Sequence, residues 1–168
     1  MKILDVGCGT AKVKGSIGID KVDLPGVDVV HNLNEFPWPF KDENFDEIYM
    51  NDIIEHLDDT IKVMEECHRL LKLGGKLHIR VVYWNHRYSF SDPTHVKFFS
   101  EITWQFFTGE RRSYYTKALF KMEKFEYIYD AKAKKLFRSK KLMNFLSYFL
   151  CNIKDGMVVT LVKELRRR

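Results

Sequence analysis

The chain has 168 residues, of which 45% are hydrophobic and 14% aromatic. This length predicts one domain with a sizeable core, and the composition excludes a disordered chain. Three widely spaced cysteines, Cys8, Cys67 and Cys151, argue against a disulfide framework and indicate a reduced, cytoplasmic setting. The longest apolar stretch, residues 142–153, is too short to span a bilayer, and no signal peptide precedes the first apolar run.

The two halves of the chain differ in charge. Residues 1–109 carry 12 Lys and Arg against 17 Asp and Glu, a net of −5, whereas residues 110–168 carry 16 against 6, a net of +10. Such an asymmetry indicates either a docking surface for an anionic partner or a solvated basic exterior. The solvated exterior is the favoured interpretation, so nucleic acid is an alternative partner and not the first expectation.

Short apolar runs in the first half predict buried strands. They lie at residues 3–6, 17–19, 27–30, 46–50 and 76–82. A helix is predicted over residues 61–72, after a cap at Asp59 and Thr60 and before a stop at Leu73-Gly74-Gly75. Strands separated by crossovers indicate an α/β fold with a parallel sheet and helices on its faces.

The second half mixes helix and strand patterns. Residues 101–107 and 114–122 predict helices, and residues 125–130 and 157–165 predict strands. Between those strands, residues 136–153 carry apolar residues at helical spacing, with basic residues at the start of the stripe. This amphipathic stretch either covers a sheet face, which would bury Phe145 and Phe149, or docks on a membrane or a partner. The covering role is favoured.

A glycine loop follows the first predicted strand. Gly7 and Gly9 lack side chains, so a cofactor can approach the backbone of this loop closely. Asp20 ends the second apolar run, where a carboxylate can accept hydrogen bonds from ribose hydroxyls. Only ten residues, Gly7–Ser16, separate the two runs, which is too few for the usual crossover helix.

Four segments in this order, LDVGCGT, IGID, FDEIYMNDIIEHL and RLLKLGGKLHI, resemble the class I S-adenosylmethionine (SAM) dependent methyltransferases. They lie within residues 3–82, about half of the chain. The resemblance implies a doubly wound, mostly parallel seven-stranded sheet with an antiparallel last strand, a Rossmann-like fold whose first crossover helix is reduced here. It also implies one methyltransferase-like domain over residues 1–168, with a cofactor-binding half (1–82) and an acceptor-loop and C-terminal half (83–168).

Two departures from the family pattern accompany this resemblance. Ala11 stands where the family loop commonly has a third glycine, and the helix after the loop has no room. Without this helix, one face of the sheet has less helical cover. Residues 136–153 are the candidate to cover that face instead.

By resemblance, SAM is the cofactor, and its contacts come from the ends of the first four strands. The implied cofactor-binding residues are Asp5, Gly7, Cys8, Gly9, Thr10, Asp20, Lys21, Asn32, Leu33, Asn51 and Asp52. Alternatives exist for three of them. Asp5 can instead fix the loop through a hydrogen bond, Leu33 can be a core residue, and Asp52 can be a solvated helix start.

A dehydrogenase would share the glycine loop, but two features argue against it. Lys12 occupies the sixth position of the loop, where Gly-x-Gly-x-x-Gly requires glycine. A pyrophosphate also needs the positive end of a full helix, which this short loop lacks. A sulfonium cofactor carries no phosphate, so the short loop favours the methyl donor.

Methyl transfer from an activated sulfonium is an in-line displacement that needs positioning, desolvation and sometimes a base. His56, His86 and His95 are candidate bases, because imidazole changes its charge near neutral pH. His56 near the predicted pocket and His95 in the loop after the fifth strand are the candidate catalytic residues. No His-x-x-x-His or paired-Cys spacing is present, so the sequence predicts no metal site.

Motifs that the sequence lacks reduce the range of possible methyl acceptors. It has no Asn/Asp-Pro-Pro-aromatic run for exocyclic base amines and no Pro-Cys context for cytosine C5. Aromatic residues after the fifth strand predict either a lid over a hydrophobic or planar acceptor or ordinary core: Tyr83, Trp84, Tyr88, Phe90, Phe98, Phe99 and Trp104. A small-molecule methyltransferase is the favoured function. The alternatives are an RNA or protein methyltransferase that docks through the basic C-terminal half, and a non-catalytic cofactor-binding domain.

Overall fold

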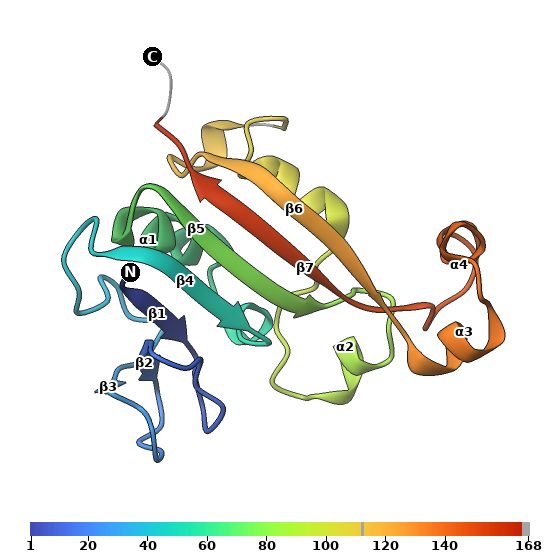
Figure 1. Cartoon of the computed structure of the whole chain (residues 1–168), viewed down its shortest axis with the longest axis horizontal. Coiled ribbons are helices and arrows are strands. Elements are labelled where there is room, and N and C mark those ends of the chain that lie inside the picture. The colour runs from blue at the N-terminus through green and yellow to red at the C-terminus, as the bar shows by residue number, and fades with distance from the viewer. Residues whose placement is uncertain (112, 166–168) are drawn as a thin grey trace.

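A computed structural model describes residues 1–111 and 113–165. Within these residues, seven strands form one sheet in the order β3-β2-β1-β4-β5-β7-β6 (Figure 1). The strands are β1 (Ile3–Val6), β2 (Ile17–Asp20), β3 (Val29–Val30), β4 (Phe45–Asn51), β5 (Leu71–Val82), β6 (Phe120–Tyr129) and β7 (Lys154–Lys163). The first five pair in parallel, and β7 runs antiparallel to both β5 and β6. The predicted Rossmann-like methyltransferase sheet with an antiparallel last strand is confirmed.

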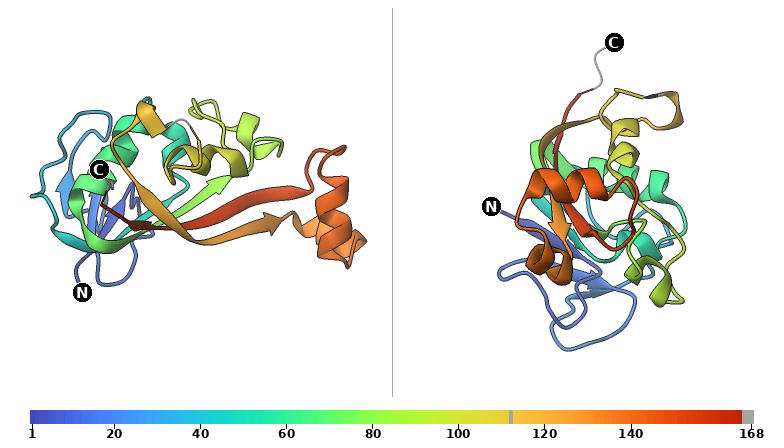
Figure 2. Two further views of the ribbon diagram at one scale, coloured as in Figure 1. Left: turned by 90° about the horizontal axis from the view of Figure 1, so that it is seen from above. Right: turned by 90° about the vertical axis from the view of Figure 1, so that its right-hand side faces the viewer.

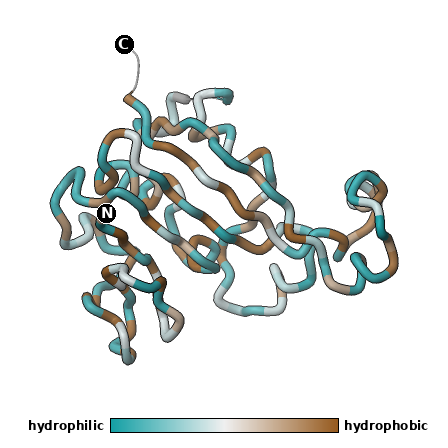
Figure 3. Tube along the Cα trace, viewed as in Figure 1, coloured by the Kyte–Doolittle hydropathy of each residue, from teal (hydrophilic) through white to brown (hydrophobic). Residues whose placement is uncertain are grey.

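One face of the sheet carries the hydrophobic core. Along β5, Leu77, Ile79 and Val81 are buried, whereas the residues between them are at least partly exposed. This alternation follows from the two-residue period of a strand, and Figure 3 shows polar and apolar residues alternating along the central strands. The large fully buried side chains, which include Trp38 and Trp104, belong to the same cluster.

Helices cover this buried face (Figure 2). Helix α1 (Thr60–Leu70) begins at Asp59, whose carboxylate accepts a hydrogen bond from the Lys62 backbone N–H at 3.0 Å. Its buried residues, Val63, Met64, Cys67 and Leu70, join the core. Short 3-10 helices η1 (Ile54–His56), η2 (Glu101–Phe106) and η3 (Ser113–Tyr115) and helix α2 (Tyr88–Ser91) complete this half of the described chain.

The opposite face of the sheet is polar, and we call it the open face. Tyr49 of β4 stacks on His78 of β5 with ring centroids 4.4 Å apart, and Glu47 accepts a hydrogen bond from the Tyr49 hydroxyl at 2.8 Å. His78 Nε2 lies 3.2 Å from a Glu47 oxygen, and Lys76 forms an ion pair with Glu123 at 2.8 Å. The expectation of helices on both faces is therefore wrong for the described residues, because polar side chains take the place of a helical cover.

Strands β6 and β7 form a ribbon that extends past the carboxyl end of β5 (Figure 1). At its end lie two short helices, α3 (Ala131–Leu136) and α4 (Lys140–Leu146). We call residues 131–153 the tip. The predicted single amphipathic helix is thus wrong in form, and its favoured covering role is wrong as well, since Phe145 and Phe149 are 60% and 74% exposed.

The predicted helix over residues 114–122 is also wrong. Only Ser113–Tyr115 form a single helical turn there, and β6 begins at Phe120. Phe120 and Met122 pair with Lys163 and Leu161 of β7, so this segment forms a strand. In the part of the chain that the structure describes, no helix has the length and apolar character needed to cross a bilayer.

Candidate active site

The carboxyl ends of β1, β2, β4 and β5 meet at one edge of the sheet, and the strand order reverses between β1 and β4. In open α/β sheets this reversal leaves a crevice in which ligands bind. The loop after β1 begins with Gly7, and β2 ends with Asp20. The two features that the sequence singles out therefore lie next to each other at the reversal point.

Hydrogen bonds hold the glycine loop against β2. The Gly7 N–H donates to the Ile19 carbonyl at 2.8 Å, and the Gly9 N–H donates to Asp20 Oδ2 at 2.9 Å. Gly7 and Gly9 have φ angles of +67° and +49°, a region that glycine enters without strain. A Cβ on Gly9 would meet nothing within 4 Å, so the space above its backbone is open to a ligand.

Gly7 and Gly18 serve packing. A Cβ on Gly7 would lie 2.3 Å from Ile53 Cγ1, and one on Gly18 would lie 2.6 Å from Cys8 Sγ. The shortened loop therefore rests directly on β2 where a helix would otherwise lie. Cys8 is buried by this contact and presents its side chain to the protein.

The two acids of this region play different structural roles. Asp5 is buried and its Oδ2 accepts from the Val13 N–H at 2.7 Å, which is the loop-fixing role weighed for it. Burial raises the pKa of Asp5, and the bond from Val13 opposes this rise. Asp20 is half-buried, and each of its oxygens accepts one backbone N–H, from Gly9 and from Val22 at 3.1 Å. A carboxylate oxygen has two lone pairs, so Asp20 keeps acceptor capacity for hydroxyls.

The remaining implied cofactor residues fall into two groups. Thr10, Lys21, Asn32, Asn51 and Asp52 are exposed around the edge. Asn32 closes its own turn, since its amide donates to Glu35 at 3.0 Å and its Oδ1 accepts from the Asn34 N–H at 3.2 Å. Leu33 is buried in the main core, and its carbonyl accepts from the Trp38 indole at 3.1 Å. This is the core position weighed for Leu33.

The structure brings His56 and His95 together. Their ring centroids lie 4.6 Å apart in an edge-on arrangement. The two rings are distant in sequence, since His56 lies 38 residues before Thr94, the neighbour of His95. Burial, followed by the neighbouring His95, lowers the pKa of His56. His86, a third histidine of this region, is fully buried between Asp130 and Asp155, at 3.5 and 3.6 Å. Its surroundings indicate a structural role.

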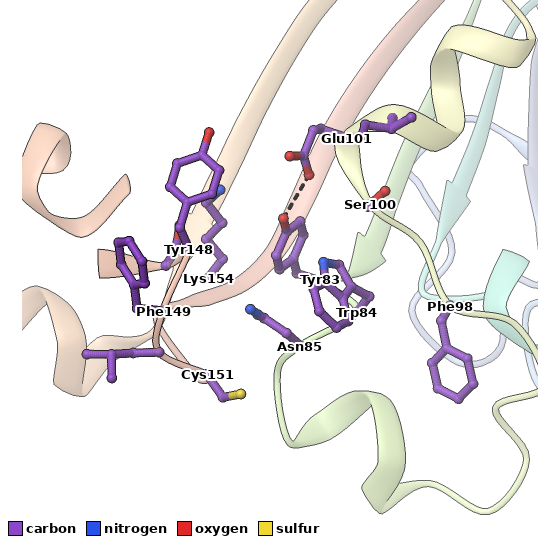
Figure 4. A pocket seen from close by; sticks show the side chains of 13 residues that line it. Tyr83, Trp84, Asn85, Phe98, Ser100, Glu101, Tyr148, Phe149, Cys151 and Lys154 are labelled. Atoms are coloured by element: carbon purple, nitrogen blue, oxygen red, sulfur yellow. Dashed lines mark hydrogen bonds between the residues drawn. The ribbon is translucent and has the colours of Figure 1, made fainter. Parts of the chain in front are cut away.

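A large cavity of about 590 Å³ opens beyond the carboxyl end of β5, between the body and the tip. Figure 4 shows Tyr83 and Trp84 facing Tyr148 and Phe149 across it. The aromatic group predicted after β5 therefore divides: Phe99 and Trp104 are core, whereas Tyr83, Trp84 and Phe98 line this cavity. Cavities of this size accommodate small molecules.

Two buried ionisable residues at these sites have no sequence signal. Glu55 is 1% exposed, burial raises the pKa of its carboxyl, and its Oε2 has no hydrogen-bond partner among the described residues. Lys154 is buried beside the cavity, with its Nζ 3.6 Å from the centroid of the Tyr127 ring. Burial lowers the pKa of Lys154, and Glu101 opposes this shift. An isolated Glu or Lys in a sequence gives no sign that it will be buried.

Comparisons with known proteins agree with this architecture. A family model described as "Methyltransferase domain" matches residues 4–79. The chain is similar to an uncharacterised protein of Methanocaldococcus jannaschii, with 33% identity over 79 residues, 47% of this chain and 34% of that protein. It is also similar to a demethylmenaquinone methyltransferase of Lysinibacillus sphaericus, with 31% identity over 97 residues, 44% of this chain and 41% of that enzyme. The matches thus span less than two thirds of either relative.

Among solved structures, a SAM dependent methyltransferase from Archaeoglobus fulgidus superposes with a TM-score of 0.69 at 18% identity, over 96% of this chain and 86% of that one. This likeness shows the shared fold. Strand order, the glycine loop and the family match define the class together. Residues 4–79 match this methyltransferase family, and the chain has the fold of the class I SAM-dependent methyltransferases, as the sequence predicts. SAM is the cofactor that this family implies.

Proposed function

We propose that this chain transfers a methyl group from SAM to a small-molecule acceptor by in-line displacement. Residues 1–82 hold the cofactor in this proposal, and residues 83–168 supply the acceptor site. The observation that carries it is the arrangement of the carboxyl edge. Gly9 and Asp20, which we call the ledge, lie on one side of the strand-order reversal. The His56–His95 pair lies on the other side.

The residues of the ledge fit SAM. The open backbone at Gly9 admits a ligand, and Asp20 has lone pairs for two ribose hydroxyls. Asn51 and Asp52 flank the crevice at the end of β4. The bound sulfonium supplies an activated methyl group, so the protein's part is to position the acceptor and exclude water. His56, held neutral by burial, is able to accept a proton from the acceptor.

We assign the acceptor to the cavity between the body and the tip. Five aromatic side chains line it among apolar and polar ones, Glu101 included, and buried Lys154 offers one cation to an oxygen-bearing group. This combination favours an apolar acceptor with a polar head over an RNA or a protein side chain. The unpaired cysteines fit a reducing, cytoplasmic setting.

The proposal is tested first by calorimetric titration with SAM. Asp20→Ala is expected to weaken binding by about 1.5–3 kcal/mol, the range for hydrogen bonds to a charged group. Asp23→Ala, an exposed neighbour, is the matched control and should bind normally. No SAM binding by the folded chain would refute the proposal and leave a non-catalytic domain.

The acceptor class is tested with radiolabelled SAM. We expect label in the organic extract of an apolar metabolite pool and none in RNA or protein fractions. Label in RNA, reduced by charge reversal in the basic C-terminal half, would instead support the alternative of an RNA methyltransferase.

A further inference from the structure

The tip is a folded unit that projects from the body at the end of the β6–β7 ribbon (Figure 2). It has a small core of its own, formed by Tyr129, Ala133, Met143 and Ile153. Asp130 caps α3 by accepting from the backbone N–H groups of Lys132 and Ala133, at 2.8 and 3.1 Å. The outward-facing residues of the tip are therefore held in a defined arrangement.

The outer surface of the tip is apolar to an unusual degree. Large apolar side chains are exposed at six positions: Leu136, Leu142, Phe145, Tyr148, Phe149 and Leu150. The rings of Phe145 and Phe149 contact each other, with centroids 5.4 Å apart, and both lie open to solvent. Several large exposed apolar side chains on so small a unit mark a surface that binds something.

The charges of the tip indicate what that partner is. Residues 131–153 contain six basic residues and no Asp or Glu: Lys132, Lys134, Lys135, Arg138, Lys140 and Lys141. Aromatic and aliphatic side chains beside lysines suit an anionic bilayer, in which the apolar groups enter the headgroup boundary and the cations meet lipid phosphates. Nucleic acid would leave the leucines exposed, and a second copy of the tip would bring like charges together.

We propose that the tip docks this protein on an anionic lipid surface, with Phe145 and Phe149 inserted at the level of the headgroups. The cavity beside the tip then opens toward the bilayer, because Tyr148 and Phe149 form one of its walls (Figure 4). Docking is a property of the tip alone and does not depend on methyl transfer.

Sedimentation with vesicles tests this proposal without SAM or an acceptor. We expect binding to vesicles of phosphatidylcholine with phosphatidylglycerol, little binding to phosphatidylcholine alone, and weakening by salt. Phe145→Ser with Phe149→Ser should reduce partitioning about tenfold or more, since both rings lose their apolar contact. Tyr114→Ala removes an equally exposed aromatic outside the tip and is the matched control.

Four results would overturn the proposal. One is the absence of sedimentation with anionic vesicles by the folded protein. Another is sedimentation that the paired serine substitutions leave unchanged. The third is a dimer in analytical ultracentrifugation that those substitutions dissociate, which would assign the surface to a second copy. Binding of an RNA oligonucleotide that needs the lysines but not the phenylalanines, with no vesicle binding, would assign it to nucleic acid.

A different observation carries a second proposal, at the carboxyl edge. His56, Asp92 and His95 each present one possible ligand atom, and these atoms lie within 4.8 Å of one another. The loop that carries Asp92 and His95 is fixed, because the backbone N–H groups of Val96 and Lys97 donate to the Glu55 carbonyl, at 2.9 and 3.1 Å. The cluster is thus assembled by backbone bonds between two loops.

The orientation of His95 suits a metal ligand. His95 Nδ1 lies 3.1 Å from the Ser89 carbonyl, which only accepts, so Nδ1 is the donor of this bond and Nε2 is the nitrogen that can face a metal ion. Glu55, whose buried Oε2 lacks a partner among the described residues, lines the adjoining cavity of about 220 Å³ together with His95.

We further propose that His56, Asp92 and His95 bind a divalent transition-metal ion, and His56 then does not act as the base while the ion is bound. Two imidazoles and one carboxylate leave coordination positions open for water or an oxygen of another molecule. Zn–N bonds of about 2.1 Å place tetrahedral ligands about 3.4 Å apart, so binding draws the three side chains together. The sequence predicted no metal site because this set has no local spacing.

Titration with Co²⁺, followed by visible absorption, and with Zn²⁺, followed by calorimetry, tests the site without SAM. We expect saturable binding of one ion, weakened about tenfold or more by His95→Ala and by Asp92→Asn. His31→Ala and Cys151→Ser are the controls for ligands elsewhere. No saturable binding, or binding that depends on Cys151 and not on His95, would overturn the proposal.

Discussion

The open face of the sheet and the tip are both surfaces without a cover, and they differ in chemistry. On the open face, Tyr49 stacks on His78 and donates a hydrogen bond to Glu47, whose carboxylate lies 3.2 Å from His78 Nε2. On the tip, the rings of Phe145 and Phe149 contact each other and are otherwise largely exposed. The loss of a helical layer therefore does not by itself create a binding surface. A surface calls for a partner when its exposed residues are apolar.

The largest expected effect is the difference in the free energy of unfolding between truncation of a buried aromatic residue and truncation of an exposed one. Trp104→Ala should lower the free energy of unfolding by about 3–5 kcal/mol, because the indole is fully buried in the main core. Phe149→Ala should change it by less than about 0.5 kcal/mol, because the ring is exposed. Denaturant unfolding of the two variants gives both values. A cost above 2 kcal/mol at Phe149, on the order of a buried side chain, would mean that the tip packs on the body.

An intermediate effect is expected where the shortened loop covers β2. Gly18→Ala should destabilise the fold by about 1–3 kcal/mol, because the new Cβ would lie 2.6 Å from both Cys8 Sγ and Lys12 Cδ. In a Cys8→Ala background the same substitution should cost less, since the sulfur is gone and the lysine side chain can move. A double-mutant cycle measured by thermal or urea unfolding gives the coupling. Equal costs in both backgrounds would show that Cys8 Sγ does not pack on Gly18.

The smallest effect concerns the polar open face and pH. Burial lowers the pKa of His78, against the pull of Glu47, so the unfolded chain binds a proton more readily than the folded one. His78 therefore removes stability as the pH falls from neutral through its unfolded pKa of about 6.5. His78→Gln should flatten this acid dependence by less than about 1 kcal/mol. A steeper loss of stability in the variant would show that the pair with Glu47 dominates.

Local patterns carry much of the fold. The apolar runs at residues 3–6, 17–19 and 46–50 mark β1, β2 and β4 to within one residue at each end, because buried parallel strands read as continuous apolar segments. The same patterns misplace residues 114–122 and 136–153. In these two segments the apolar spacing is compatible with more than one structure. The pairing of β6 with β7, which are distant in sequence, decides which structure forms.

The candidate site divides in the same way. The glycine loop and Asp20 are close in sequence and their joint role at one edge is predictable. The convergence of His56 with Asp92 and His95 depends on the bonds from Val96 and Lys97 to Glu55, which no spacing encodes. Burial of Lys154 among aromatic rings likewise depends on three separate elements.

The length of the β6–β7 ribbon determines how far the tip lies from the carboxyl edge of the sheet. Each pair of residues adds about 6–7 Å of strand and keeps side chains on their original sides, whereas a single residue reverses them. Removing one residue pair from both strands would bring the tip closer to the carboxyl edge in the same orientation. Removing one residue from each would turn Phe145 and Phe149 to the other side of the ribbon. The length of the ribbon thus sets the distance between the candidate active site and the surface that the tip contacts. It also sets the direction in which the tip faces.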